Sequence, residues 1–248
     1  AFLLNGISFL PVITGLLMMN AAEFYTTKRQ ADRPVNPLAE LHEGLAYAFR
    51  TPAVLLIVIL VAAIGMFGFN FTVMLPLVDR FVLGRGAAEL GFLTAAVGLG
   101  ALSSALLLAR RATASRHTLF AGGAAFAVLL GAVALSQWFY ATLLVLLLLG
   151  MASTAFSATA NTSLQMATPD HLRGRVMALY MLLFAGSTPI GGFFTGFMAE
   201  HLGVPATIGI EAGLCVLGLS AGLLYYLSHR RQVAATADAS VVAAGQAS

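Results

Sequence analysis

The sequence predicts an all-α membrane protein with about seven transmembrane helices, and three observations support this prediction. Of the 248 residues, 59% are hydrophobic and only 9% are charged, whereas a soluble domain carries roughly 25% charged residues to cover its surface. Uncharged runs recur along the chain at the length of a membrane-spanning helix. Basic residues gather in alternate connections between those runs. The composition therefore indicates a protein whose surface lies in the hydrocarbon of a lipid bilayer.

The uncharged runs define the spans one by one, because a helix needs about 20 apolar residues to cross the bilayer core. The first predicted span covers residues 1–22, and six more follow within residues 53–228 as one bundle. Residues 117–169 contain no Asp, Glu, Lys or Arg, so this stretch is long enough for two helices. Trp138 and Tyr140 lie at the division between them and suit an aromatic anchor at the membrane interface.

The basic residues predict the orientation of the chain. If the first span ends in the cytoplasm, one side of the membrane holds eleven Lys and Arg residues and the other side only Arg80 and Arg85. This bias places the C-terminus on the cytoplasmic side of the membrane. It also explains the net charge of +3, so we expect no nucleic-acid partner. The eleven residues are Lys28, Arg29, Arg33, Arg50, Arg110, Arg111, Arg116, Arg173, Arg175, Arg230 and Arg231.

The connections predict a middle loop and a tail. Residues 23–52 form the longest polar connection, and within it residues 37–50 are expected to form an amphipathic helix at the cytoplasmic interface. Residues 229–248 are rich in Ala, Ser and Val and are expected to be a disordered tail. The apolar stripe of the amphipathic helix comprises Leu38, Leu41, Leu45 and Phe49, opposite Glu40, His42 and Glu43.

Four stretches resemble the major facilitator superfamily of transporters, and in particular the branch of the enterobactin exporter and the transmembrane secretion effectors. The resemblance implies that residues 1–22 are the sixth helix of a twelve-helix fold and residues 53–228 its C-terminal half. Since the chain opens inside an apolar run, we interpret it as truncated, with the missing N-terminal half as a partner. The stretches are Phe2–Leu10, Met74–Val78, Glu89–Gly100 and Thr168–Met177.

The family resemblance also implies a function. It predicts secondary active transport by alternating access, as proton-coupled efflux of a small amphipathic molecule such as a siderophore or a drug. The expected partners are that small-molecule substrate and the membrane lipids, with no cofactor. A membrane scaffold or receptor that transports nothing is the alternative.

The stretch at Thr168–Met177 supplies candidates for a cytoplasmic gate. Thr168 could cap the following helix, and Asp170 would complement its N-terminal dipole. Arg173 and Arg175 could pair with a carboxylate from a neighbouring loop, and the resemblance implies that such charges close an inside gate. The alternative is ordinary helix capping with arginines that only set the topology.

Polar residues inside the spans supply candidates for the substrate cavity, because each is costly in lipid unless it faces protein or water. Asn70, Ser157 and Asn161 are the candidates, and helix-to-helix or intrahelical hydrogen bonds are the alternative for all three. Glu211 lies about two turns inside the last span and is the candidate for proton coupling. Alternatively, its side chain reaches the outer interface.

Two further patterns concern helix packing and chemistry. Gly192 and Gly196 form a small-residue face suited to close helix contact, and Pro189 predicts a kink. No His-Glu-x-x-His pattern occurs in the sequence, and we expect no enzyme and no catalytic residues. No metal site is expected either, because the histidines lie in loops or at helix ends. They are His42, His117, His171, His201 and His229.

Overall fold

The computed structural model describes residues 37–110 and 115–246, with side chains for 41–110 and 115–230, and isolated residues between Phe9 and Met18. The chain divides into two units, residues 1–36 and residues 37–248. In the first unit, the Met18 amide donates to the Thr14 carbonyl at 3.0 Å, which is a helical turn. Apart from these isolated residues, the predicted span at residues 1–22 lies outside the described residues, as do residues 23–36 of the connection after it.

The second unit is a bundle of helices, and its described part contains six that are long and apolar enough to cross a membrane. This confirms the predicted all-α membrane class. The six are Pro52–Val82, Ala87–Ala109, Arg116–Leu135, Phe139–Met166, Asp170–Leu202 and Val204–Arg230. The elements are α2 (Pro37–Arg50), α3 (Pro52–Gly68), α4 (Phe71–Leu77), the π-helix η2 (Val78–Val82), α5 (Ala87–Ala109), α6 (Arg116–Leu135), α7 (Phe139–Met166), α8 (Asp170–Phe184), α9 (Thr188–Leu202) and α10 (Val204–Gln246).

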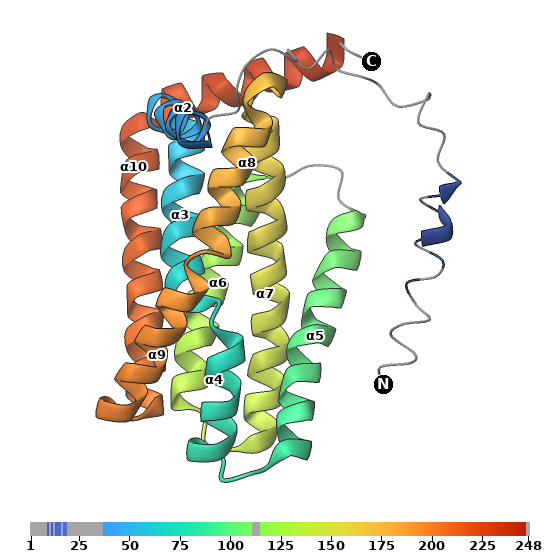
Figure 1. Ribbon diagram of the computed structural model, residues 1–248. Helices are drawn as coiled ribbons and strands as arrows, with labels where there is room; N and C mark the ends of the chain where they lie inside the picture. The colour runs from blue at the N-terminus through green and yellow to red at the C-terminus, as the bar shows by residue number, and fades with distance from the viewer. Residues whose placement is uncertain are drawn as a thin grey trace. The chain divides into compact units, whose positions relative to one another are not determined.

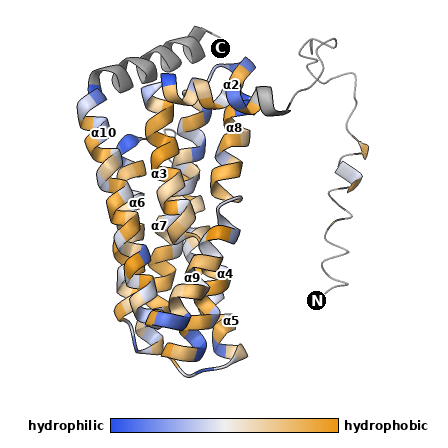
Figure 2. Cartoon of the chain, turned by 60° about the vertical axis from the view of Figure 1, so that its left-hand side comes forward, coloured by the Kyte–Doolittle hydropathy of each residue, from blue (hydrophilic) through white to orange (hydrophobic). Residues whose placement is uncertain are grey.

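The helices of this unit run up and down along the length of the bundle (Figure 1). Helix α7 packs against α5 and α6, α10 packs against α3 and α6, and α8 packs against α3. Hydrophilic residues are concentrated near the two ends, and the middle is mostly hydrophobic (Figure 2). One end carries α2, the turn between α7 and α8, and the end of the span in α10 (Figure 1). We call it the arginine-rich end, since Arg50, Arg173, Arg175 and Arg230 lie there.

Two glycines bring the backbones of α5 and α7 into contact. A Cβ atom on Gly100 would lie 1.9 Å from the carbonyl oxygen of Leu147, and one on Gly150 would lie 2.2 Å from that of Val97. No side chain larger than hydrogen fits at either position. Close backbone packing of this kind holds helices together in lipid, where the hydrophobic effect does not act between them.

Two of the six spans are interrupted near their middle. The first is interrupted at Phe69 and Asn70, between α3 and α4, and the second between α8 and α9. The second interruption comes just before Pro189, where a kink is predicted, and Pro189 lies in the first turn of α9. Proline is tolerated there because the first amides of a helix have no intrahelical acceptor. The bundle therefore contains two breaks at similar depth.

Helix α2 has the predicted bounds, and Leu41 of the predicted apolar stripe packs against the core of the bundle. Ala48 and Gly44 are buried, whereas Leu45 and Phe49 are 38% and 64% exposed. A Cβ atom on Gly44 would lie 3.2 Å from the carbonyl oxygen of Arg175 on α8. Small residues make the contact because the two backbones approach closely, which leaves Leu45 and Phe49 pointing away from α8.

The backbone of the C-terminal segment, where a disordered tail is predicted, is described as part of α10 up to Gln246. Helix α10 extends to Gln246, with non-helical dihedral angles inside it only at His229 (φ −114°, ψ 16°). The segment after His229 is rich in alanine, the residue with the highest helix propensity. This local preference accounts for the helical backbone, and the disorder of the tail stays a prediction.

Candidate functional site

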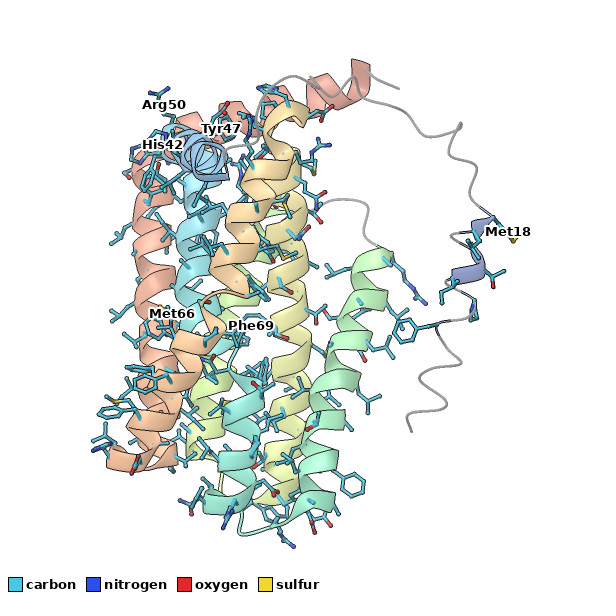
Figure 3. All side chains as sticks on the ribbon, in the orientation of Figure 1. Met18, His42, Tyr47, Arg50, Met66 and Phe69 are labelled. Atoms are coloured by element: carbon cyan, nitrogen blue, oxygen red, sulfur yellow. The ribbon has the colours of Figure 1, made fainter. Side chains whose placement is uncertain are left out.

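Asn70 occupies the break between α3 and α4, and its side chain is 2% exposed. Its Nδ2 donates to the carbonyl oxygen of Met66 at 3.0 Å, a group that the end of α3 leaves without its usual intrahelical donor. Its Oδ1 is buried and has no hydrogen-bond donor among the described residues. Met66 and the neighbouring Phe69 lie about midway along the bundle (Figure 3). Asn70 therefore offers one unused acceptor next to residues that lie about midway along the bundle.

Helix α9 is pressed against this break through Gly191. A Cβ atom on Gly191 would lie 2.1 Å from the Met66 carbonyl oxygen and 2.6 Å from Nδ2 of Asn70. Gly192 and Gly196 were the glycines predicted to pack: a Cβ atom on Gly192 would lie 3.3 Å from Val73, which is a tight contact, and one on Gly196 would meet open space. The closest contact is made by Gly191, which the prediction missed because spacing alone does not tell which face of α9 meets α3.

Glu211 lies on α10 and is 1% exposed. Its Oε1 is hydrogen-bonded to the hydroxyl of Thr195 on α9. Thr195 is itself 1% exposed, and its hydroxyl also lies 2.9 Å from the carbonyl oxygen of Gly191. The carboxyl group thus faces α9 inside the bundle, so the alternative that it extends to the outer interface does not apply in this structure.

Asn70, Gly191, Thr195 and Glu211 together form what we call the polar cluster. It joins the break in the first described span to α9 and α10. The sequence analysis selected Asn70 and Glu211 separately and missed Thr195 and Gly191. In the sequence, Thr195 is distinguished only by its position four residues after Gly191. Small residues with this spacing are common where helices pack closely. No ion pair to Glu211 occurs among the described side chains.

Ser157 and Asn161, the other two predicted cavity residues, lie on the half-buried face of α7. The Ser157 hydroxyl donates to the carbonyl oxygen of Thr154 at 3.4 Å, as the intrahelical alternative predicted. Asn161 accepts a hydrogen bond from Gln165 through its Oδ1. Tyr180 on α8 donates to the carbonyl oxygen of Ser157 at 3.4 Å, so this part of α7 faces α8.

Four aromatic side chains connect that face to Asn70, and we call them the aromatic row: Tyr180, Phe184, Phe69 and Phe126. Tyr180 and Phe184 are stacked with ring centroids 5.6 Å apart. Phe184 and Phe69 are 4.8 Å apart, and Phe69 stacks on Phe126 at 5.1 Å. The row crosses α8, the α3–α4 break and α6. The sequence analysis selected none of these four rings, since 17 phenylalanines are scattered along the chain and none stands out.

The predicted gate residues form two ion pairs at the arginine-rich end. Arg173 pairs with Asp170 within α8 at 2.7 Å, and Arg175 pairs with Glu43 of α2 at 2.9 Å. A pairing of arginine with a carboxylate from a neighbouring loop was predicted, and Glu43, which lies on α2 within the predicted middle loop, supplies it. Tyr47 of α2 adds a hydrogen bond of 3.0 Å from its hydroxyl to the carbonyl oxygen of Ala167 in the turn before α8.

The predicted cap of α8 is wrong. The Thr168 hydroxyl donates backwards to the carbonyl oxygen of Leu164 at 2.7 Å, and Pro169 precedes the helix without any side-chain cap. A buried threonine at the end of α7 satisfies its hydroxyl within its own helix, so it is not available to the next one. Asp170 still lies in the first turn of α8, where the helix dipole favours a negative charge.

A cavity of about 370 Å³ lies between α5, α6 and α7, away from the polar cluster. None of the predicted site residues lines it. Its walls are mostly apolar, with the hydroxyl groups of Ser104 and Thr118 as exceptions. The remaining lining residues are Leu107, Leu108, Gly122, Ala125, Leu129, Leu148, Met151, Ala152 and Ala155.

Asp79 in η2 is a buried carboxyl group that the sequence analysis did not select. It is 4% exposed, and its Oδ1 has no hydrogen-bond partner among the described residues. Its backbone carbonyl accepts from the Arg85 amide at 3.0 Å, which closes the turn before α5. Within the described part of the chain, no three His, Cys, Asp or Glu side chains come together in a way that could hold a metal ion.

Comparison with known proteins identifies the family. A family model described as transmembrane secretion effector matches residues 1–244, nearly the whole chain. The chain belongs to this family. The predicted membership of the major facilitator superfamily is thereby confirmed, and the chain comes from a transporter family with multi-pass membrane proteins.

A curated relative agrees with this assignment. The chain is 28% identical over 192 residues to the multidrug efflux pump Tap of Mycolicibacterium fortuitum. The match covers 75% of this chain and 46% of the relative, so the chain aligns with about half of that protein's length. No solved structure matches the chain.

Proposed function

We propose that the chain is one half of a secondary active transporter that exports a small amphipathic molecule in exchange for protons. The observation on which this depends most is the carboxyl group of Glu211, 1% exposed between membrane-spanning helices and contacting no basic side chain among the described residues. An ionisable group at such a position is costly and is typical of proton relays in transporters. The relative that is an efflux pump supports export as the direction.

The substrate would lie against the aromatic row, next to Ser157 and Asn161. Phe69 and Phe184 are only partly buried, so their ring faces can contact an apolar body. The half-buried hydroxyl and amide of Ser157 and Asn161 can bind a polar group on the same molecule. Asn70, with its unused Oδ1, is a third polar contact. It becomes accessible if α9, which now covers it through Gly191, moves away from the break between α3 and α4. This combination of apolar walls and few polar groups is typical of small-molecule sites.

The gate would consist of the two ion pairs at the arginine-rich end. We propose that this end of the bundle faces the cytoplasm. Arg175 and Glu43 connect α8 to α2, and Arg173 and Asp170 lie beside them. When the substrate site opens to the cytoplasm, these contacts would separate, and they would form again when it opens outward. The breaks at Asn70 and before Pro189 allow the outer halves of two spans to tilt without moving their inner halves.

A second half-bundle would complete the transporter. Major facilitator folds place substrate between two six-helix halves, and the described part of this chain supplies six spans. We propose that the partner half precedes this chain in the complete protein and that the assembly lies in a bacterial inner membrane. No enzymatic activity is proposed.

The test measures export by the complete transporter reconstituted in lipid vesicles, with a fluorescent lipophilic cation as substrate and an imposed pH gradient. Glu211→Gln should abolish the acceleration of transport by the gradient, because the amide cannot carry the exchanged proton. Glu200→Gln is the matched control, since Glu200 is exposed at the end of α9. Transport by the Glu211→Gln protein that still responds fully to the gradient would rule out Glu211 as the carrier.

A further inference from the structure

Thr195 has too few protons for the contacts that it makes. Its hydroxyl lies 2.9 Å from the carbonyl oxygen of Gly191 and is also hydrogen-bonded to Oε1 of Glu211. A hydroxyl group has one proton to donate and can accept hydrogen bonds as well. The Gly191 carbonyl can only accept. If the Thr195 proton points to Gly191, then the contact with Glu211 is a hydrogen bond only if the carboxyl group donates.

We propose that Glu211 carries a proton in this conformation and donates it to Thr195, which in turn donates to Gly191. This inference rests on the proposed function in one respect, since it takes the proton on Glu211 to be the one that is exchanged. The chain of hydrogen bonds then has a direction, from α10 through the Thr195 side chain to the backbone of α9. Thr195 is a positioning residue, because its hydroxyl passes the effect of the Glu211 proton on to the Gly191 carbonyl of α9.

The surroundings of Glu211 favour the neutral form. Helix α10 packs against α3, α6, α9 and η2, and α3 contains no charged residue. Cys215, one turn further along α10, is the titratable group nearest to Glu211 in the chain, and its thiol is buried beside Gly68. The other titratable or charged groups on the packed elements lie at helix ends or in η2: Asp79, Arg80, Arg116, His117, Glu200 and His201. Within the described side chains, no positively charged group forms an ion pair with Glu211.

Loss of the proton would change α9. A carboxylate is a stronger acceptor than a backbone carbonyl, so the single Thr195 proton would turn from Gly191 to Glu211. A threonine that donates back to the carbonyl four residues earlier bends its helix, and this bend would be released. Gly191 packs directly on Met66 and Asn70, and its amide donates to the Ser187 carbonyl at 2.8 Å in the α8–α9 break. Deprotonation would therefore alter the first turn of α9 where it covers Asn70.

The test combines infrared spectroscopy with transport by the complete transporter in lipid vesicles. The carbonyl stretching band of a protonated carboxyl group is assigned to Glu211 by its loss in Glu211→Gln. Thr195→Val keeps the side-chain shape without the hydroxyl, and Thr195→Ser keeps the hydroxyl. Thr207→Val is the matched control, because Thr207 is fully buried and donates to Gly203 at 2.9 Å in the same backward geometry without a hydrogen bond to Glu211.

Thr195→Val should move the Glu211 band to higher frequency and reduce gradient-driven transport roughly tenfold, the effect of one lost hydrogen bond to a buried group. Thr195→Ser should restore both, and Thr207→Val should change neither. The inference is overturned if the wild type has no band that Glu211→Gln removes, or if Thr195→Val behaves like Thr207→Val. A band that shifts in Thr195→Val, with wild-type transport that ignores the gradient, would support the hydrogen-bond chain while refuting proton exchange.

Discussion

Arg175 of α8 binds Glu43 of α2 through an ion pair of 2.9 Å, and this contact joins the helix that precedes the bundle to the fifth described span. The Arg175 and Glu43 side chains are 28% and 55% exposed. An ion pair with this exposure contributes at most about 1 kcal/mol to stability. Its main effect would therefore be on the balance between conformations, which differ by similar small energies.

We expect Glu43→Gln to change the accessibility of the arginine-rich end while leaving the melting temperature within a few degrees of the wild type. The neutral amide keeps the shape of the side chain and removes the charge that Arg175 binds. Accessibility is measured as the labelling rate of a cysteine introduced at Gly174, where a Cβ atom meets open space. Asp170→Asn tests the neighbouring pair within α8. Equal labelling rates in the wild type and Glu43→Gln would show that this pair does not hold the end closed.

Gly191→Ala should destabilise the bundle more than any other glycine substitution in α9. The new methyl group would lie 2.1 Å from the Met66 carbonyl oxygen, so α9 must move, at a cost of about 1–3 kcal/mol. Thermal unfolding of the protein in detergent measures the difference. Gly196→Ala is the control, because nothing lies within 4 Å of the position that its Cβ atom would occupy. Equal melting temperatures for the two variants would contradict the contact through Gly191.

Phe184→Leu should raise the KM of the transported molecule by roughly two- to tenfold, because an aromatic contact is worth about 0.5–1.5 kcal/mol. Phe184 contacts both Tyr180 and Phe69 in the aromatic row. Phe193→Leu is the matched control, since Phe193 is 74% exposed and pairs only with Phe197 among the described rings. If both substitutions leave KM unchanged, the aromatic row does not contact the substrate.

Ala125→Leu should be tolerated, because Ala125 lines the cavity between α5, α6 and α7 and the larger side chain can fill it. Ala127→Leu on the same helix should lower the melting temperature, because Ala127 is 1% exposed in the packed core. Overpacking of such a site costs about 1–3 kcal/mol. Unfolding in detergent compares the two. A loss of stability in Ala125→Leu as large as that in Ala127→Leu would mean that the cavity is closed in the membrane.

The spans and their alternation could be predicted from the sequence, since both depend on local composition. The uncharged run of residues 117–169 predicts two helices with a division near Trp138, and α6 and α7 meet there. Asn70 and Glu211 could be selected because a polar group in an apolar run stands out. These features need no knowledge of which helices are neighbours.

The contacts between helices could not be predicted in the same way. Thr195 and Gly191 look ordinary in the sequence, and they become part of a site only because α9 lies between Asn70 and Glu211. The predicted packing face of α9 was one residue away from the real one, which on a helix is a rotation of about 100°. Thr168 is a second example. Its hydroxyl can either donate back to α7 or cap α8, and the sequence does not tell which of the two bonds forms.

The glycine contacts between α5 and α7 restrict how the bundle can change shape. With Gly100 against Leu147 and Gly150 against Val97, no layer of side chains separates the two backbones, so neither helix can rotate or slide without lifting off the other. Alternating access would have to carry α5 and α7 as a single rigid pair. Spin labels placed on the two helices should then keep a constant separation while labels on either side of the α8–α9 break do not.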